Sequence, residues 1–195
     1  MHPLIHALIE GRNDILKNAI TLYHGSVYEF DTVDVTKGKP FKDFGIGFYT
    51  TQNIDHAKRL AIRNKNLEEK RKALRGNTEP SPAWLYTYEF DIAEINKLNT
   101  RKFDTADREW VQFVIQNRRS QQKEHDYDIV IGPTANDNTN ATIDLFMMGT
   151  YGDPQSNFAI ETFLRLILPE VLPQQIYFGS MNAANHLLFK GRESI

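Results

Sequence analysis

The chain has 195 residues, the upper end of one ordinary domain, and its 23 Lys and Arg against 25 Asp and Glu leave a net charge of −2. Proteins that rely on nonspecific attraction to phosphates carry a clear basic excess, so this balance argues against that class. Hydrophobic residues make up 41% and cysteine is absent, which permits a core and excludes disulfide scaffolds, cysteine-bound zinc and thiol catalysis. No apolar run can span a bilayer and the N-terminus does not resemble a signal peptide, so we expect a soluble, cytoplasmic protein with no membrane partner.

The first half of the chain mixes helical and β patterns. Apolar residues at helical spacing predict an N-terminal helical arm over residues 1–20, and a β-type run follows over residues 21–27. A glycine-punctuated segment ends in a predicted strand over residues 47–51. Asn53 is the predicted N-cap of a helix that runs to about residue 74. The expected buried stripe of this helix consists of Ala57, Leu60, Ala61 and Leu67.

The second half begins after a turn-rich segment over residues 76–82. The elements predicted there are a strand over 84–90, a helix over 106–118 capped by Thr105, a strand over 127–131 that ends at Gly132 and Pro133, helices over 143–148 and 158–168, a strand over 174–178 and a closing helix over 181–188. This irregular alternation predicts an α+β fold with a mixed sheet, in one domain over residues 21–195. Glycine spacings of the Rossmann and P-loop types are absent, so those folds are excluded.

Two glycine-containing motifs are candidates for a ligand site. In Tyr23-His24-Gly25-Ser26 a histidine stands beside a glycine, whose missing side chain lets a ligand approach the backbone. A turn with a hydrogen-bonded histidine explains the same pattern equally well. Further along, Phe48 and Tyr49 directly follow Gly45-Ile46-Gly47 and are suited to wall a flat pocket for an aromatic ring. Taken alone, such a Gly-x-Gly is more typical of a bulge or a tight turn.

Acidic and basic groups offer weaker signals. Glu109 lies on an amphipathic helix, where a surface salt bridge is the simpler explanation, and Asp126 and Asp128 point to one face of a strand. His125 lies nearby, but the other histidines show no ligand spacing and we expect no metal. Eight Lys and Arg lie between residues 58 and 75. They indicate either a solvated helix face or a surface that attracts an anionic cofactor or a nucleic acid.

The order of the motifs is more specific than any one of them. Tyr-His-Gly-Ser on a strand, then Gly-Ile-Gly-Phe-Tyr before a helix, then Gln-Gln-Ile-Tyr-Phe on a late strand resembles the ADP-ribosyltransferase superfamily. The branch is the histidine–tyrosine–glutamate one of diphtheria-type toxins and poly(ADP-ribose) polymerases. Within it, residues 22–189 look like a bacterial family of unknown function. The resemblance implies a split mixed and antiparallel sheet with flanking helices.

What the resemblance implies for the site is NAD+ as substrate, without a metal. His24 would hydrogen-bond a ribose hydroxyl, backbone groups of Gly25 would hold the nicotinamide amide, and Tyr49 would stack on the nicotinamide ring. These positions suit cleavage of the nicotinamide–ribose bond, which needs orientation and stabilisation of positive charge. The other cofactor-binding positions it implies are Ser26, Gly45, Gly47 and Phe48.

The catalytic acid of the branch corresponds to Gln175 in this chain. A glutamine is neutral, so it can orient the ribose but cannot act as a base. Glu109 is the first candidate to replace the acid, and Asp128 is the second. Chain-extending polymerase activity is therefore disfavoured, and slow transfer, NAD+ hydrolysis or binding alone stay open.

Three functions remain in competition. The first is a mono-ADP-ribosyltransferase, as found among intracellular toxins, which modifies an unknown macromolecular or small-molecule acceptor and, by analogy, is paired with an antitoxin. The second is a catalytically weak or inactive module that binds NAD+ or ADP-ribose, which Gln175 favours. The third is a structural or interaction protein, which is favoured if His24 and Tyr49 do not share one pocket. Release of nicotinamide separates the first from the second.

Overall fold

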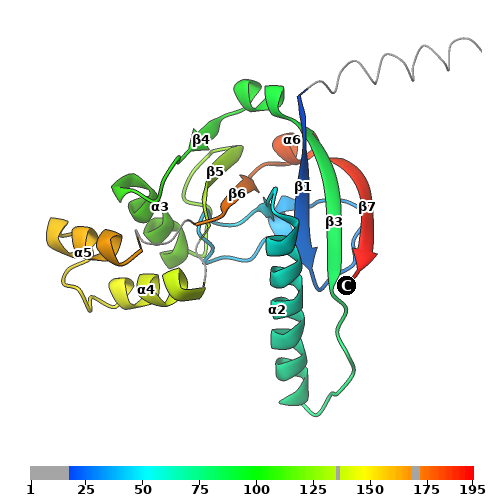
Figure 1. Cartoon of the computed structure of the whole chain (residues 1–195), viewed down its shortest axis with the longest axis horizontal. Helices are drawn as coiled ribbons and strands as arrows, with labels where there is room; N and C mark the ends of the chain where they lie inside the picture. Colours follow the sequence, from blue (N-terminus) through cyan, green and yellow to red (C-terminus); the bar gives the residue numbers. More distant parts are fainter. Residues whose placement is uncertain (1–17, 135–136, 168–171) are drawn as a thin grey trace, which may run out of the picture.

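The structure is a computed structural model that describes residues 18–134, 137–167 and 172–195. Residues 1–17 of the predicted helical arm lie outside these ranges, and its last two residues belong to a strand. The elements in chain order are β1 (Ala19–Ser26), η1 (Val35–Lys37), β2 (Phe48–Thr50), α2 (Ile54–Ala73), β3 (Trp84–Asp91), η2 (Ile92–Lys97), β4 (Thr100–Lys102), α3 (Arg108–Arg119), β5 (Ile129–Pro133), α4 (Asp137–Met147), α5 (Asn157–Ile167), β6 (Gln174–Phe178), α6 (Met181–Ala184) and β7 (Leu188–Ser194) (Figure 1).

The strands form two sheets, so the predicted α+β class is confirmed. One sheet has the order β1-β3-β7 and is antiparallel, and the other has the order β2-β6-β5-β4, with only the β4–β5 pair parallel. The two sheets meet at one backbone bridge, where Tyr23 N donates to Thr51 O at 2.8 Å and Thr51 N donates to Tyr23 O at 3.0 Å. This bridge sets β1 beside β2 and therefore brings together the two glycine-containing motifs.

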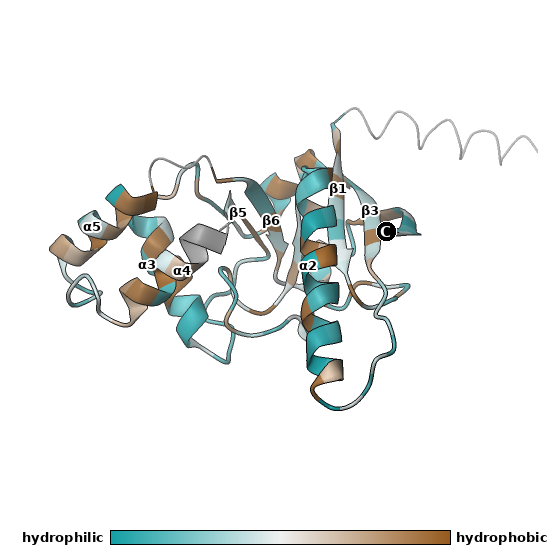
Figure 2. Ribbon diagram, turned by 60° about the horizontal axis from the view of Figure 1, so that its bottom comes forward, coloured by the Kyte–Doolittle hydropathy of each residue, from teal (hydrophilic) through white to brown (hydrophobic). Residues whose placement is uncertain are grey.

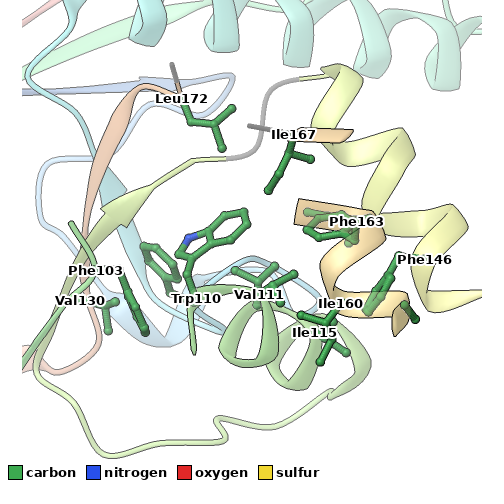
Figure 3. Close-up of a cluster of buried hydrophobic side chains, with 14 of the residues drawn as sticks. Phe103, Trp110, Val111, Ile115, Val130, Phe146, Ile160, Phe163, Ile167 and Leu172 are labelled. Carbon is green, nitrogen blue, oxygen red and sulfur yellow. The ribbon is translucent and has the colours of Figure 1, made fainter. Parts of the chain in front are cut away.

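Two apolar clusters pack on opposite faces of the four-stranded sheet. The helical core joins one face to α3, α4 and α5 through residues such as Trp110, Phe146 and Phe163 (Figure 3). The inter-sheet core joins the other face to β1 and β3, and contains Phe48 and Tyr86. Because side chains alternate along a strand, neighbouring residues of β2 and β6 belong to different cores.

Helix α2 packs on β1 through its small residues. Asn53 is its N-cap and accepts a hydrogen bond from His56 N at 2.9 Å, as predicted. Ala57 and Ala61 are buried, whereas the predicted stripe is wrong for Leu60 and Leu67, which are exposed. The close approach of the helix to Gly25 leaves room only for small side chains, which hydrophobic spacing does not reveal. None of the helices in the described ranges is long and apolar enough to cross a membrane.

Several predicted boundaries are corrected by capping and by pairing. Helix α3 begins at Arg108, because the side chain of Asp107 rather than Thr105 accepts from the first turn, at Trp110 N. The predicted closing helix ends at Ala184, and residues 188–194 instead form β7 beside β3. β4 was not predicted, because it has three residues and owes its extended conformation to parallel pairing with β5. α4 starts six residues before the predicted position.

The contact between Gly25 and α2 makes a direct prediction for stability. A Cβ at position 25 would lie 2.2 Å from Ala57 O, which is helix backbone and cannot rotate away. We expect Gly25→Ala to lower the free energy of unfolding by about 2–3 kcal/mol in urea titration, the usual cost of overpacking. Gly76→Ala is the control, because a Cβ there meets nothing within 4 Å and only its φ of +76° is unfavourable, which costs about 1 kcal/mol. Equal losses in both variants would contradict this account of the packing.

Candidate functional site

His24 lies where β1 and β2 come together. Its Nδ1 is 2.7 Å from the backbone carbonyl oxygen of Tyr49, and its ring lies 4.3 Å from the ring of Phe48. The rings of Phe30 and Tyr86, which stack 4.1 Å apart, complete the aromatic surroundings. The motif histidine and the second glycine motif, 25 residues apart in sequence, are therefore in direct contact.

The contact with Tyr49 fixes the chemical state of His24. A carbonyl oxygen only accepts, so Nδ1 carries the hydrogen and Nε2 presents a lone pair. Burial lowers the pKa of His24 to about 4 and outweighs the Tyr49 hydrogen bond, which acts in the opposite direction. The imidazole is therefore neutral at pH 7. Nε2 has no hydrogen-bond partner among the described residues, which makes it an acceptor for a hydroxyl group.

Gly25 has an open hydrogen-bonding edge. The register that pairs Tyr23 with Thr51 would next pair Gly25 with Tyr49, but those backbone bonds are not formed, and Tyr49 O instead accepts from His24. Tyr23 directs its N–H and C=O to Thr51 and away from β3. Gly25, two residues on, directs its backbone groups the same way, so it is opposite Leu85 of β3 without a hydrogen bond to it. The N–H and C=O of Gly25 thus point toward β2, and the described part of the chain supplies no partner for them.

Tyr49 directs its side chain away from His24. Its ring lies 5.2 Å from that of Tyr177, on the sheet face of the helical core, and burial raises its pKa well above the usual value. Its hydroxyl donates to Gly45 O at 2.7 Å and accepts from Phe44 N at 3.0 Å. The rings of His24 and Tyr49 therefore do not share one pocket; Phe48 is the aromatic ring of β2 on the His24 side.

The other predicted cofactor-binding residues have structural contacts. Ser26 is buried and its hydroxyl accepts from Tyr28 N at 3.0 Å. Gly45 has φ +83°, and a Cβ there would lie 2.7 Å from Asn117 Oδ1. A Cβ at Gly47 would lie 2.2 Å from the ring of Tyr177. Both glycines are thus explained by the tight loop before β2.

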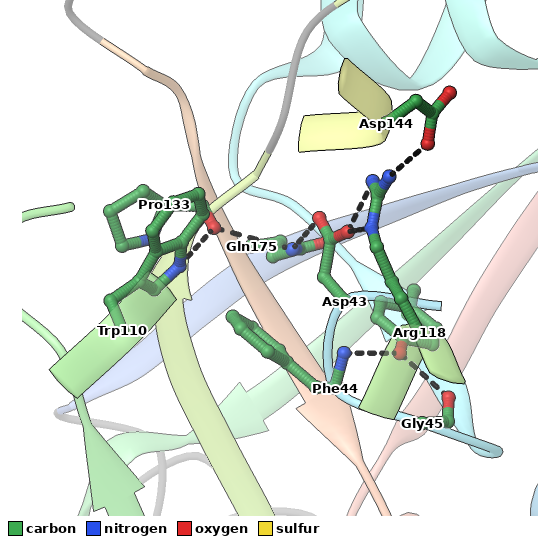
Figure 4. A network of polar contacts seen from close by, with 9 residues as sticks. Asp43, Phe44, Gly45, Trp110, Arg118, Pro133, Asp144 and Gln175 are labelled. Carbon is green, nitrogen blue, oxygen red and sulfur yellow. Dashed lines mark hydrogen bonds and ion pairs between the residues drawn. The ribbon is translucent and has the colours of Figure 1, made fainter. Parts of the chain in front are cut away.

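Gln175 lies in a buried polar network on the same face as Tyr49. Its Nε2 donates to Asp43 Oδ2 at 3.2 Å and to Pro133 O at 3.4 Å (Figure 4). Asp43 Oδ1 accepts from Arg118 Nε at 2.8 Å and from Nη2 at 2.6 Å. Trp110 Nε1 donates to the same Pro133 oxygen at 3.0 Å. The amide of Gln175 joins the loop before β2 to β5 and faces away from the His24 side of the sheet.

The acidic candidates also have partners elsewhere. Glu109 is exposed in the first turn of α3 and forms an ion pair with Arg101. Asp128 accepts from Asn99 N at 3.1 Å and from the hydroxyl of Ser180. Asp126 is exposed, and its backbone oxygen accepts from Asn99 Nδ2 at 3.1 Å. The structure brings none of these three carboxylates into contact with His24.

His125 has a structural role in the loop before β2. Its Nε2 donates to Phe44 O at 2.9 Å and its Nδ1 accepts from Tyr127 N at 3.2 Å. Burial lowers its pKa, so this ring too is neutral at pH 7. In the ranges that the structure describes, no three His, Asp or Glu residues are grouped to hold a metal ion.

A cavity of about 260 Å³ on the His24 side of the four-stranded sheet was not predicted. It is lined by Gln52, Lys102, Asp104, Ile131, Gln174 and Ile176. Gln174 is thus the exposed glutamine of β6 and Gln175 the buried one. Alternation along β6 places the two glutamines on opposite faces of the sheet, but it does not show which face carries an opening.

The network around Gln175 predicts that a carboxylate is not tolerated there. In Gln175→Glu the new group would face the carboxylate of Asp43 and a carbonyl oxygen without a hydrogen to donate. We expect the free energy of unfolding to fall by about 2–3 kcal/mol at pH 7, and by less at pH 4, where protonation restores a donor. Gln174→Glu, one residue away and exposed, should leave stability nearly unchanged in the same urea titration. A Gln175→Glu protein as stable as the parent would contradict the assigned network.

The pKa of His24 predicts a pH dependence of stability. Because the pKa is about 4 in the folded state and about 6.5 in the unfolded state, the unfolded chain binds the extra proton between these values. Stability therefore falls as the pH is lowered through this window, by about 2 kcal/mol between pH 8 and pH 5 from this group. Burial lowers the pKa of His56 and His125 too, so the parent protein loses more than this in total.

The variant His24→Asn isolates that contribution. Asparagine keeps an N–H donor close to the position of Nδ1 and does not titrate. The loss between pH 8 and pH 5, measured by urea unfolding, should be about 2 kcal/mol smaller in His24→Asn than in the parent. An identical loss in both proteins would show that His24 is not buried as a neutral imidazole.

Comparison with known proteins identifies the family. Residues 20–189 match the family described as "Protein of unknown function (DUF3990)". No curated protein and no solved structure gave a significant match. The match begins within β1 and ends early in β7, so it includes strands of both sheets and every residue of the site described above. The chain therefore belongs to the DUF3990 family.

Proposed function

We propose that the chain binds NAD+ at the open edge of Gly25 and cleaves its nicotinamide–ribose bond, as a mono-ADP-ribosyltransferase-like protein. The observation that carries this proposal is the missing pair of backbone hydrogen bonds between Gly25 and Tyr49. A strand that loses its partner after one bridge leaves an N–H and a C=O side by side. Such unpaired backbone groups favour a ligand that completes the pairing.

A primary carboxamide is the complement of that edge. Its N–H2 donates and its carbonyl accepts, and one N–H and the C=O lie on the same edge of the group. The nicotinamide amide would therefore donate to Gly25 O and accept from Gly25 N–H, as the next residue of a β ladder does. A carboxylate in the same place would offer no donor to the carbonyl oxygen, so nicotinic acid is the discriminating analogue.

His24 and Phe48 supply the neighbouring contacts in this proposal. The lone pair on His24 Nε2 accepts from a ribose hydroxyl, and it does so at neutral pH because burial keeps the imidazole uncharged. The ring of Phe48, 4.3 Å from that of His24, is the buried aromatic ring of β2 that packs on this side. In this proposal Phe48 takes the place that the resemblance gives to Tyr49, packing beside the nicotinamide ring. Tyr49 contributes its backbone oxygen, which accepts the hydrogen bond from His24.

The reaction needs little beyond orientation. As the bond from ribose C1′ to the ring nitrogen breaks, its electron pair neutralises the nicotinamide, and an acceptor nucleophile attacks C1′ and loses its proton to solvent. Holding the carboxamide at Gly25 and the hydroxyl at His24 fixes the two sides of the breaking bond. The acceptor is a macromolecule or a small molecule, with water as the simplest case.

Binding of NAD+ or ADP-ribose without cleavage is the second candidate function. The observation that favours it is the position of the acidic groups: Glu109 pairs with Arg101, and Asp128 binds Asn99 and Ser180. Gln175 at the position of the catalytic acid is bound to Asp43 on the far face of the sheet. A protein of this kind would hold the nucleotide through the same carboxamide edge and release no nicotinamide.

Titration calorimetry with NAD+ and an assay of released nicotinamide test both candidates. Parent protein should bind NAD+, and His24→Ala should weaken binding roughly tenfold, since it removes one acceptor and part of the aromatic surface. His186→Ala is the control, because His186 is an exposed histidine just after α6 that pairs with Glu94. Nicotinamide release above the His24→Ala level supports cleavage, and binding without release supports the second candidate.

An absence of NAD+ binding would reject both candidates. In that case His24 is a core histidine that is satisfied by Tyr49 O, and the third hypothesis, a structural or interaction protein, would stand. The separation of the His24 and Tyr49 rings is the observation that favours this hypothesis.

A further inference from the structure

Helix α2 exposes far more surface than it uses for packing. Of its 20 residues only Ala57 and Ala61 are buried, both in the first half, against β1. The second half extends past the strands it packs on, as both views show (Figures 1 and 2). Most of its residues are hydrophilic, with isolated hydrophobic ones among them (Figure 2). The packing of the fold therefore does not explain the residues that this half presents.

A row of leucines runs along the exposed side of α2. Leu60, Leu67 and Leu74 follow one another at intervals of seven residues, two helical turns, and so lie on one line. Their exposed fractions are 37%, 42% and 89%, rising toward the free end of the helix. A regular apolar row of this kind is typical of a surface that contacts another helix.

Cationic side chains flank the leucine row. The residues one turn before and after Leu67, at the spacing of helix neighbours, are Arg63, Asn64, Lys70 and Arg71. From residue 54 to residue 75 there are eight Lys and Arg against three Asp and Glu, a balance of +5 in a chain whose net charge is −2.

The acidic residues of the helix do not neutralise this surface. Glu68 pairs with Arg71 at 3.8 Å, and Glu69 accepts from Ser81 N at 3.0 Å. Lys70, Lys72 and Arg75 form no ion pair within the ranges that the structure describes. A partner with carboxylates would therefore meet cations that are available for pairing.

We propose that the leucine row and its basic flanks are the docking site for an acidic amphipathic helix of a partner protein. Leucines bury apolar residues of that helix, and the flanking cations pair with its carboxylates, as at the edges of a coiled coil. A second copy of this chain is a poor partner, because two α2 helices would bring +5 against +5. A nucleic acid is less well matched, because the leucine row offers its phosphates nothing.

This inference goes beyond the proposed function and does not depend on NAD+ binding. The rest of the chain has a negative net charge, opposite to that of α2, because the whole chain is at −2 although residues 54–75 are at +5. An acidic helix approaching α2 is thus directed to this surface and repelled from others. Salt should weaken such an encounter, since most of the cations are exposed.

Defined probes test the proposal with the whole chain. The first probe is a helical peptide of about 21 residues with leucines in heptad positions and glutamates beside them. The second is the same peptide with lysines in place of the glutamates, and the third is a single-stranded RNA of about 20 nucleotides. We expect the acidic peptide to bind in fluorescence anisotropy, the basic peptide not to bind, and the RNA to bind more weakly than the acidic peptide.

Variants locate the binding to α2. Leu67→Ser and the pair Lys70→Glu with Arg71→Glu should each weaken the acidic peptide roughly tenfold, and both change exposed residues that the fold does not need. Leu145→Ser on α4 is the control for Leu67→Ser, because 43% of the surface of Leu145 is exposed, close to the value for Leu67. The pair Lys37→Glu with Lys39→Glu is the control for the change in charge. Acidic-peptide binding that is absent, that survives Leu67→Ser, or that is weaker than RNA binding would overturn the proposal.

Discussion

The contact between His24 and the backbone oxygen of Tyr49 is the interaction on which the candidate site depends. Among the described residues, the backbone pairing of β1 with the β2 segment is limited to the bridge between Tyr23 and Thr51, just after β2. Beyond it the imidazole occupies the hydrogen-bonding position that Gly25 would otherwise fill. The ring is held between strands of two different sheets, where it is half-buried and neutral. Gly25 gains an unpaired edge from the same arrangement, while α2 packs closely on its other side. The hydrogen bond from the His24 side chain thus adds a second link between the sheets and leaves the backbone groups of Gly25 without a partner among the described residues.

Several hydrogen bonds fix the loop before β2 on the opposite face of the sheet. Asp43 accepts from Arg118 and Gln175, Tyr49 bonds to Phe44 and Gly45, and His125 donates to Phe44 O. Gln175 is a donor in this network, a role that a carboxylate cannot perform. A neutral amide at the position where the resemblance expects an acid therefore has a structural explanation. Position 175 serves the shape of the loop rather than the His24 side.

Sequence patterns predicted the elements whose signals are local. The Asn53 cap, the aromatic strand β3 and the strand β6 follow from capping and alternation. β7 was missed because Leu188–Ser194 has no clear alternation and owes its conformation to pairing with β3. The opposite directions of Tyr49 and His24 depend on the register of β2, which no local pattern reveals. The same holds for the loss of pairing at Gly25.

The proposed site depends on recognition of a carboxamide by the backbone of Gly25. The most direct measurement is a titration of the ¹⁵N-labelled protein with nicotinamide, followed through the backbone amide signal of Gly25, with nicotinic acid as the matched ligand. We expect a saturable downfield shift of the Gly25 amide proton with nicotinamide, as a new hydrogen bond forms, and a much smaller shift with nicotinic acid. An unchanged Gly25 signal, or the same shift with both ligands, would contradict the claim.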